Sequence, residues 1–113
     1  MTAYGIAHLR TTSEHDDILE YLERIQATLD PYGGRFVIHG GPVTVVEGSW
    51  PGTLVAIAFP SMTQVREWYD SPAYRAILPL RTKHLDGDVI MIEGVDPDTH
   101  DSAAMAAALR ARR

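Results

Sequence analysis

His39 is the residue of this sequence best suited to acid–base chemistry. It alternates with Arg35 and Val37 along a short apolar segment, which places a histidine and an arginine on one face of a predicted strand. The pKa of an imidazole lies near neutrality and shifts readily with burial or a neighbouring carboxylate, so His39 could give or take a proton. The alternative is a partly exposed histidine bonded to the backbone or to a dimer partner.

Two arginines are candidates for holding an anionic oxygen. The planar guanidinium groups of Arg35 and Arg81 suit a carboxylate, a phosphate or an enolate. Structural ion pairs, for example with Glu47 or Asp70, are the competing interpretation.

Four aromatic residues could shape a binding site. Trp68 and Tyr69 are adjacent on a predicted helix and point about 100° apart, so they cannot both face the core squarely. We expect Trp68 to pack in the core, and Tyr69 or Tyr74 to present a hydroxyl to a cavity. Trp50 follows a glycine turn and could border the same space.

Metal and cofactor motifs are absent from the sequence. There is no phosphate-binding glycine loop, dinucleotide fingerprint or HExxH motif, and the five histidines share no metal-ligand spacing. Only His8 and His39, both on predicted strands, could point into one space, and a third ligand such as Glu47 or Glu93 cannot be placed. We therefore expect neither a metal nor another cofactor.

Composition indicates one globular domain. The chain has 113 residues, of which 45% are apolar and 22% charged, and its net charge is −5. The only dense basic run, Arg110 to Arg113, closes the sequence, which argues against nucleic-acid binding. There is no cysteine, no evident export signal and no apolar run long enough to cross a bilayer. We expect a cytoplasmic protein that does not act at a membrane.

The predicted strands are apolar or alternating segments bounded by turn residues. They cover residues 3–10, 35–39, 43–47 (resuming the second strand after Gly40-Gly41-Pro42), 54–59 and 89–93. In the first strand, Tyr4, Ile6 and His8 should face one way and Ala7 and Leu9 the other.

The predicted helices are marked by apolar spacings of three and four. The first begins at Ser13 as N-cap and carries its apolar stripe on Ile18, Leu22, Ile25 and Leu29. The second begins at Ser61, which has capping-box spacing to Gln64. It breaks at Ser71-Pro72 and continues over residues 73–81.

The order β-α-β-β-α-β predicts an α+β, ferredoxin-like domain over residues 1–95, with one antiparallel four-stranded sheet. Helices on one side leave the other sheet face bare and apolar, so we expect a homodimer formed sheet against sheet, a dimeric α/β barrel. Residues 96–113 read as a linker followed by an alanine-rich C-terminal helix or tail.

Several short motifs resemble one bacterial family when taken together. They are Tyr32-Gly33-Gly34-Arg35-Phe36, Gly40-Gly41, Glu47-Gly48-x-Trp50, Phe59-Pro60-Ser61, Trp68-Tyr69-x-Ser71-Pro72-x-Tyr74, Pro79-Leu80-Arg81 and Glu93-Gly94. Over residues 3–95 the chain resembles the DUF1330 family of the dimeric α/β-barrel superfamily. The resemblance implies the fold and the dimer. Family members often carry arginine where this chain has His39.

The superfamily that this resemblance implies includes cofactor-independent monooxygenases, isomerases, cyclases, dehydratases and haem-binding proteins. Our main hypothesis is a small-molecule enzyme using acid–base chemistry in an apolar pocket. His39, Tyr69 and Arg81 would be catalytic, and the substrate would contact Arg35, His8, Trp50, Tyr74 and Trp68. The alternatives are a non-catalytic small-molecule binder or stress-related accessory protein, a cofactor-independent monooxygenase, and a haem protein with His8, His39 or His84 as axial ligand.

Overall fold

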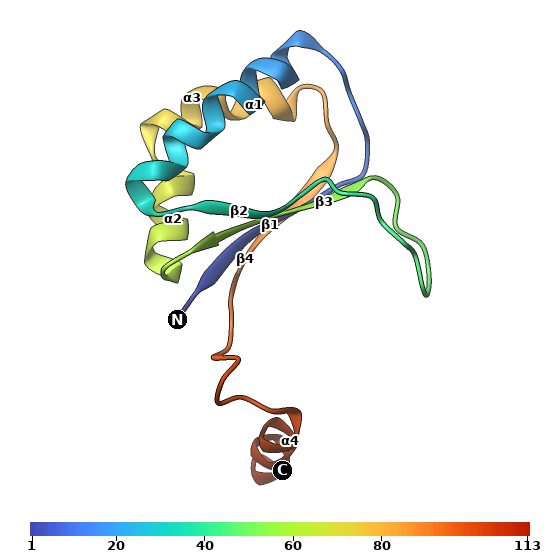
Figure 1. Cartoon of the computed structure of the whole chain (residues 1–113), viewed down its shortest axis with the longest axis vertical. Coiled ribbons are helices and arrows are strands. Elements are labelled where there is room, and N and C mark those ends of the chain that lie inside the picture. Colours follow the sequence, from blue (N-terminus) through green and yellow to red (C-terminus); the bar gives the residue numbers. More distant parts are fainter.

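A computed structural model describes all 113 residues and shows one antiparallel sheet covered on one side by helices (Figure 1). The sheet order β2-β3-β1-β4 places the two strands joined by the first helix on either side of β3, as in the ferredoxin-like fold. The strands are β1 (Ala3–Leu9), β2 (Arg35–His39), β3 (Thr53–Phe59) and β4 (Gly87–Glu93). The helices are α1 (Asp16–Leu29), η1 (Asp30–Tyr32), α2 (Met62–Asp70), α3 (Pro72–Thr82) and α4 (Ser102–Ala111). The predicted fold is confirmed.

Helix α1 begins two residues later than the sequence predicts. Its N-cap is His15, whose Nδ1 accepts the Asp17 backbone N–H at 3.0 Å. Ser13 acts one step earlier, because its hydroxyl accepts the His15 N–H at 3.1 Å. The N-cap of α1 is therefore His15 and not the predicted Ser13. The hydrogen bond to the Asp17 N–H fixes the ring of His15 at the start of the helix.

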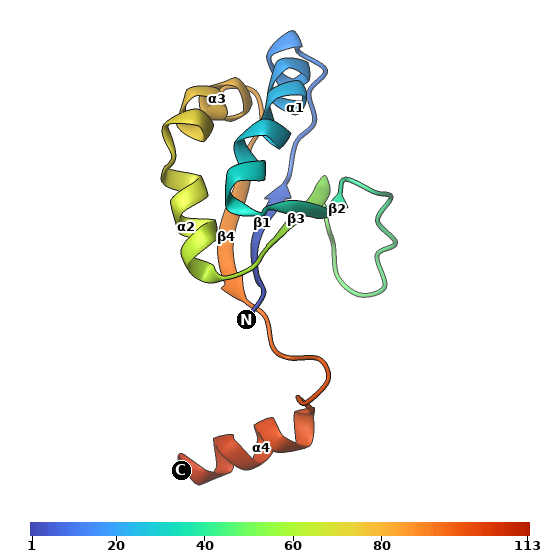
Figure 2. The ribbon, with the colours of Figure 1, turned by 60° about the vertical axis from the view of Figure 1, so that its left-hand side comes forward.

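The predicted strand over residues 43–47 is wrong. Strand β2 ends at His39 and pairs only with β3, leaving the segment after Gly40 without a partner strand. Every residue from 40 to 52 is exposed, including Val43, Val45 and Val46. This segment forms a long loop that projects from the β2–β3 edge of the sheet (Figure 2).

A bulge at Val37 overturns the predicted alternation in β2. Phe36 pairs with Ile57 and Ile38 pairs with Ala56, so Val37 has no partner of its own. The extra residue shifts the side chains that follow by one position. His39 pairs with Val55 and lies on the same face as Phe36, whereas the simple alternation assigned His39 to the face of Arg35.

The break between α2 and α3 lies at Ser71-Pro72, as predicted. The Ser71 hydroxyl donates to the Trp68 carbonyl at 2.7 Å and accepts the Tyr74 backbone N–H at 3.3 Å. Ser71 thus closes one helix and caps the next. At the start of α2, the Ser61 hydroxyl contacts the Gln64 side chain at 2.5 Å, without the expected bond to a backbone N–H.

The core lies between the sheet and the layer formed by α1, α2 and α3. Its buried members include Leu29, Phe59, Val65 and Ile77. The other sheet face carries exposed apolar side chains: Ile38, Ile90 and Ile92 are each about half exposed. Helix α4 stands away from the sheet at the end of residues 94–101 (Figures 1 and 2). None of the helices has the length and apolarity required to span a membrane.

The turn into β2 depends on Gly34. A Cβ there would lie 2.7 Å from the Phe59 ring and 2.9 Å from the Leu29 side chain, both almost fully buried. We expect Gly34→Ala to lower the free energy of unfolding by about 1–3 kcal/mol, because neither core side chain can withdraw without strain. Urea denaturation measures the difference.

Gly41→Ala is the matched control, because a Cβ at Gly41 meets nothing within 4 Å. Equal denaturation midpoints for the two variants would contradict the assigned role of Gly34.

Candidate functional site

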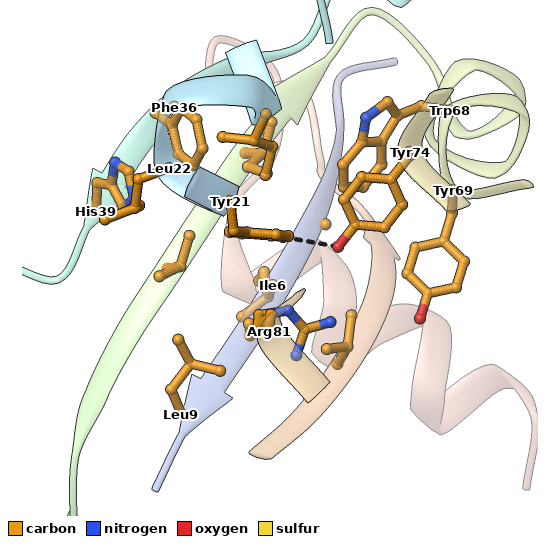
Figure 3. A pocket seen from close by; sticks show the side chains of 16 residues that line it. Ile6, Leu9, Tyr21, Leu22, Phe36, His39, Trp68, Tyr69, Tyr74 and Arg81 are labelled. Atoms are coloured by element: carbon orange, nitrogen blue, oxygen red, sulfur yellow. Dashed lines mark hydrogen bonds between the residues drawn. The ribbon is translucent and has the colours of Figure 1, made fainter. Parts of the chain in front are cut away.

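An apolar cavity lies between the sheet and the three packed helices (Figure 3). Its volume is about 90 Å³, and 13 of its 16 lining residues are hydrophobic. The lining comprises Gly5, Ile6, Ala7 and Leu9 of β1, Tyr21, Leu22 and Ile25 of α1, Phe36 and His39 of β2, Val55 and Ile57 of β3, Trp68 and Tyr69 of α2, Tyr74 and Arg81 of α3, and Val89 of β4. A few polar groups therefore converge in an otherwise apolar space, which is the usual composition of a small-molecule site.

Two buried phenols from different helices meet in the cavity wall. The hydroxyls of Tyr21 and Tyr74 are 2.7 Å apart, and the rings meet edge to face at 6.2 Å. Burial, together with the neighbouring Tyr74, raises the pKa of Tyr21 far above its usual value. Each phenol has one proton, and only one of the two protons can lie between the oxygens. The pair therefore keeps one O–H free to donate to a ligand.

Arg81, a largely buried residue, places a positive charge beside this pair. The residue is only 8% exposed, and its guanidinium lies 5.8 Å from the centroid of the Tyr21 ring. Burial alone would lower the pKa of Arg81, but the phenol oxygens of Tyr74 and Tyr21 favour the charged form more strongly, so its pKa is raised. No ion pair of the chain includes Arg81. Asp70, one of the acidic residues considered above as an ion-pair partner for the arginines, pairs instead with Arg75 at 2.9 Å.

His39 lies at the rim of the cavity, on the edge strand. Its ring stacks on Phe36 with centroids 4.0 Å apart and an angle of 4° between the planes. Partial burial lowers the pKa of His39 from its usual value of 6.5, which favours the neutral imidazole near pH 7. A neutral, oriented imidazole is suited to accept a proton.

The structure brings together five of the predicted site residues and separates three. His39, Trp68, Tyr69, Tyr74 and Arg81 all line the cavity. Trp68 is also a core residue, 4% exposed, and its indole N–H donates to the Thr28 hydroxyl at 3.0 Å.

His8, Trp50 and Arg35 lie outside the cavity lining. His8 stacks on Trp50 at 4.0 Å and its Nε2 lies 2.7 Å from the Pro51 carbonyl oxygen, so it anchors the long loop. His8 and His39, which the sequence allowed to point into one space, lie apart, because the bulge turns His39 toward the helices.

Tyr21 is the site residue that the sequence reasoning missed. The apolar stripe of α1 was assigned to Leu22, which is 45% exposed, whereas Tyr21 is 9% exposed. Tyr21 follows Ile18 by three residues and precedes Ile25 by four, so the same periodicity also fits the tyrosine. Outside the cavity, His15, Asp17 and His84 form a second polar cluster.

The family comparison matches nearly the whole globular part of the chain. The family described as "Domain of unknown function (DUF1330)" covers residues 2–95. The chain belongs to the DUF1330 family. This confirms the resemblance found in the sequence motifs, and it leaves α4 outside the matched region. No curated protein matches the chain.

Solved structures share the fold of this DUF1330 chain at low identity. A Rhodopseudomonas palustris protein of unknown function has a TM-score of 0.66 and 16% identity, covering 85% of this chain and 84% of its own. A dimeric ferredoxin-like protein of unknown function from Jannaschia sp. CCS1 has a TM-score of 0.67 and 12% identity, covering 83% and 100%. SnoaB, a cofactor-independent oxygenase from Streptomyces nogalater, has a TM-score of 0.54 and 10% identity, covering 88% and 96%. At these identities the likeness establishes the fold.

Removing the Tyr74 hydroxyl should destabilise the DUF1330 domain. In Tyr74→Phe the buried Tyr21 hydroxyl loses its partner, which should lower the free energy of unfolding by about 1–3 kcal/mol. The double variant Tyr21→Phe/Tyr74→Phe removes both polar groups and should cost less than the sum of the single variants. Urea denaturation of the four proteins checks this; strictly additive losses would show that the hydroxyls do not interact.

The ring of His39 should titrate below pH 6.5. Between that pH and its lower folded pKa, the unfolded chain binds a proton at His39 that the folded chain does not, so stability falls as the pH is lowered. NMR titration of the imidazole measures the folded pKa directly. His39→Gln should flatten the pH dependence of unfolding below pH 6.5; an unchanged profile would show that burial of His39 is not linked to folding.

Proposed function

We propose that this protein is a homodimeric small-molecule enzyme that uses acid–base chemistry on a substrate bearing an anionic oxygen. The reaction class is isomerisation, cyclisation, dehydration or a related elimination. Arg81 holds the oxygen, His39 moves the proton, and Tyr21 and Tyr74 orient the bound group. The observation that carries this proposal is Arg81 in the cavity wall: the residue is 8% exposed, its guanidinium has no carboxylate partner within the chain, and its unbonded nitrogen atoms are not buried.

The position of Arg81 favours a binding role over a structural one. A charge set in a mostly apolar cavity wall loses part of its hydration, which costs free energy unless a partner compensates it. The aromatic ring of Tyr21 at 5.8 Å and the nearby phenol oxygens compensate only in part. A carboxylate or enolate bound in the cavity would complete the pairing, with bidentate guanidinium bonds and one bond from the free phenol proton.

The chemical step follows from the two kinds of polar group. The neutral imidazole of His39 takes a proton from a carbon next to a carbonyl, and the electron pair moves to the carbonyl oxygen to form an enolate. Arg81 stabilises that negative oxygen. Return of the proton to a different carbon completes an isomerisation, whereas loss of a β-hydroxyl group as water, after protonation by the imidazolium, completes a dehydration.

The cavity sets the size of the substrate. Its volume of about 90 Å³ is well below the roughly 300–1,000 Å³ of pockets for drug-sized ligands. Leu22 and His39, both on its rim, are exposed, so a larger substrate would extend outward past these residues. We therefore propose a small metabolite, or a larger one that inserts only its anionic group.

The homodimer is proposed to form through the bare face of the sheet. Ile38, Ile90 and Ile92 expose apolar surface there, and burying such a face is the usual reason for dimers of this kind. The Jannaschia protein with the same fold is dimeric. Pairing of two sheets would close the dimeric α/β barrel expected from the sequence.

Two other functions predict different outcomes at the same cavity. A cofactor-independent oxygenase, the activity of SnoaB, would form the same enolate and add oxygen to it. A binder would hold the anion without converting it. The mass of the product separates these cases: an isomer keeps the substrate mass, a dehydration product loses water, and an oxygenase product gains oxygen.

The test compares metabolites consumed by wild type and by variants. Purified protein is incubated with a metabolite extract of its source cells and analysed by mass spectrometry. We expect one metabolite to be converted by wild type, and conversion to be lost in both His39→Ala and Arg81→Met. Retention without conversion, equal in wild type and His39→Ala, would favour the binder.

Arg81→Met also separates binding from folding. Methionine has similar length and carries no charge, so replacing a cation that has no carboxylate partner in a largely apolar wall should leave stability unchanged or raise it. Arg24→Met is the control, because Arg24 is exposed, pairs with Glu20 at 2.7 Å and lies outside the cavity. A large loss of stability in Arg81→Met would show that the guanidinium is structural and would overturn the proposed role.

A further inference from the structure

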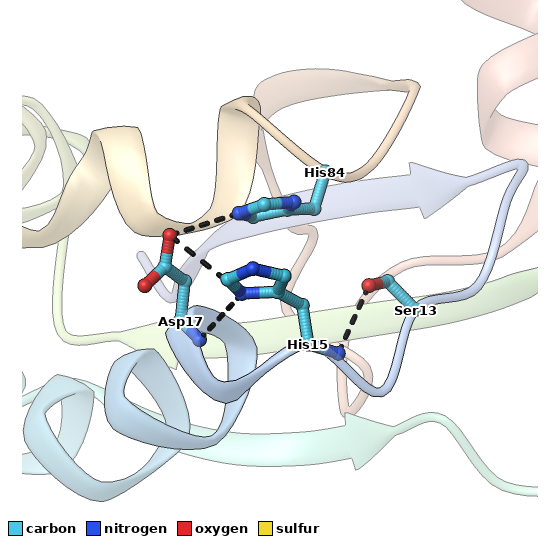
Figure 4. A network of polar contacts seen from close by, with 4 residues as sticks. All are labelled: Ser13, His15, Asp17 and His84. Carbon is cyan, nitrogen blue, oxygen red and sulfur yellow. Dashed lines mark hydrogen bonds and ion pairs between the residues drawn. The ribbon is translucent and has the colours of Figure 1, made fainter.

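A second polar cluster joins the start of α1 to His84, which follows the end of α3 by two residues (Figure 4). His84 Nε2 lies 2.8 Å from Asp17 Oδ2, although the two residues are 67 positions apart in the chain. His15 Nδ1 lies 3.8 Å from the same carboxylate oxygen, and the two imidazole rings stack with centroids 3.9 Å apart. The Asp17 carboxylate is thus hydrogen-bonded to His84 and lies close to His15, whose Nδ1 accepts the Asp17 backbone N–H.

We propose that His15, Asp17 and His84 form a binding site for a divalent metal ion of the zinc class. Each residue offers one ligand atom, and the three atoms lie within 4.8 Å of one another. Zinc bonds of about 2.0–2.2 Å to nitrogen and oxygen place tetrahedral ligands roughly 3–4 Å apart. His15 is exposed and Asp17 and His84 are half-buried; to reach that arrangement, the stacked imidazole rings must turn so that one nitrogen of each points to a common centre.

The donor set selects the class of metal. Two imidazole nitrogens and one carboxylate oxygen suit Zn²⁺, and also Ni²⁺ or Cu²⁺, better than Mg²⁺ or Ca²⁺, which prefer oxygen ligands. The metal would take the place of the proton between His84 Nε2 and Asp17 Oδ2. Three protein ligands leave a fourth position for water or another small ligand.

The surroundings moderate the affinity. The positive end of α1 and the nearby Lys83 oppose a cation. Glu14 and Asp16, the chain neighbours of His15, add negative charge beside the cluster. We expect binding in the micromolar range.

The site would brace the helices that carry the cavity. Asp17 precedes Tyr21 by four residues on α1, and Arg81 precedes His84 by three, so each ligand lies about one helical turn from a cavity residue. A metal bound here would tie the start of α1 to the end of α3. The inference does not depend on the proposed function, since the three ligands lie outside the cavity lining.

The experiment titrates Zn²⁺ into metal-free full-length protein without a histidine tag, using calorimetry and thermal denaturation. The variants are His84→Gln, whose amide can still donate to Asp17, and His15→Asn, whose side-chain oxygen can still cap α1. His100→Gln is the control, because His100 lies outside the cluster.

Wild type and His100→Gln should bind one Zn²⁺ per chain and gain thermal stability on binding. His84→Gln and His15→Asn should each bind at least about tenfold more weakly, a loss of about 1.4 kcal/mol or more, while keeping the wild-type circular dichroism spectrum. Equal affinity in wild type and both variants, or no saturable Zn²⁺ binding by wild type, would overturn the proposal. Mg²⁺ as probe should give no comparable gain in stability.

Discussion

The buried hydrogen bond between Tyr21 and Tyr74 is the contact on which the packing of α1 against α3 depends. Beside it lies the charge of Arg81, a residue that is 8% exposed; this charge needs compensation from its surroundings, and no carboxylate of the chain pairs with it. The compensation comes from α1 and α3 together, because Tyr21 lies on the first helix and Tyr74 and Arg81 on the second. When the two helices pack so that the phenol groups meet, both phenols also lie beside the charge. Packing and electrostatics are satisfied by the same contact.

The space beside this charge arises from small residues on the central strand. On the helix side of β1 lie Gly5 and Ala7, where a larger side chain would fill the gap under the aromatic layer. The neighbouring strand presents Ile57 and Val55 opposite these positions. Large side chains in the helix layer over small ones in the sheet leave a cavity that no single helix residue fills. The sheet is thus the floor of the site as well as the scaffold of the fold.

The sequence was sufficient to predict the order of elements, because apolar periodicity and turn residues are local signals. Side-chain direction in β2 was not predictable, since a bulge at Val37 depends on pairing with β3 and has no marker within β2 itself. The burial of Tyr21 was not predictable for a similar reason. The apolar periodicity of α1 is compatible with either Tyr21 or Leu22 on the buried face, and the contact that selects Tyr21 is with Tyr74 of α3. The direction of His39 and the burial of Tyr21 thus both depend on contacts with segments far away in the sequence. Arg81 and Tyr74 were predicted as site residues from residue type, since a guanidinium and a phenol carry chemistry wherever they lie, and both line the cavity.

The His15–Asp17–His84 cluster, proposed here as a metal site, could not be predicted from the sequence for the same reason. Spacing rules detect ligands that follow one another on one helix or loop, and His84 is separated from Asp17 by 67 positions. The cluster exists because α1 packs antiparallel to α3, which brings the first turn of one helix to the last turn of the other (Figures 1 and 4). The same helix pairing produces the Tyr21–Tyr74–Arg81 group one turn further in. Both polar groups are therefore consequences of a single packing contact, and any shift of α1 along α3 would disturb the two together.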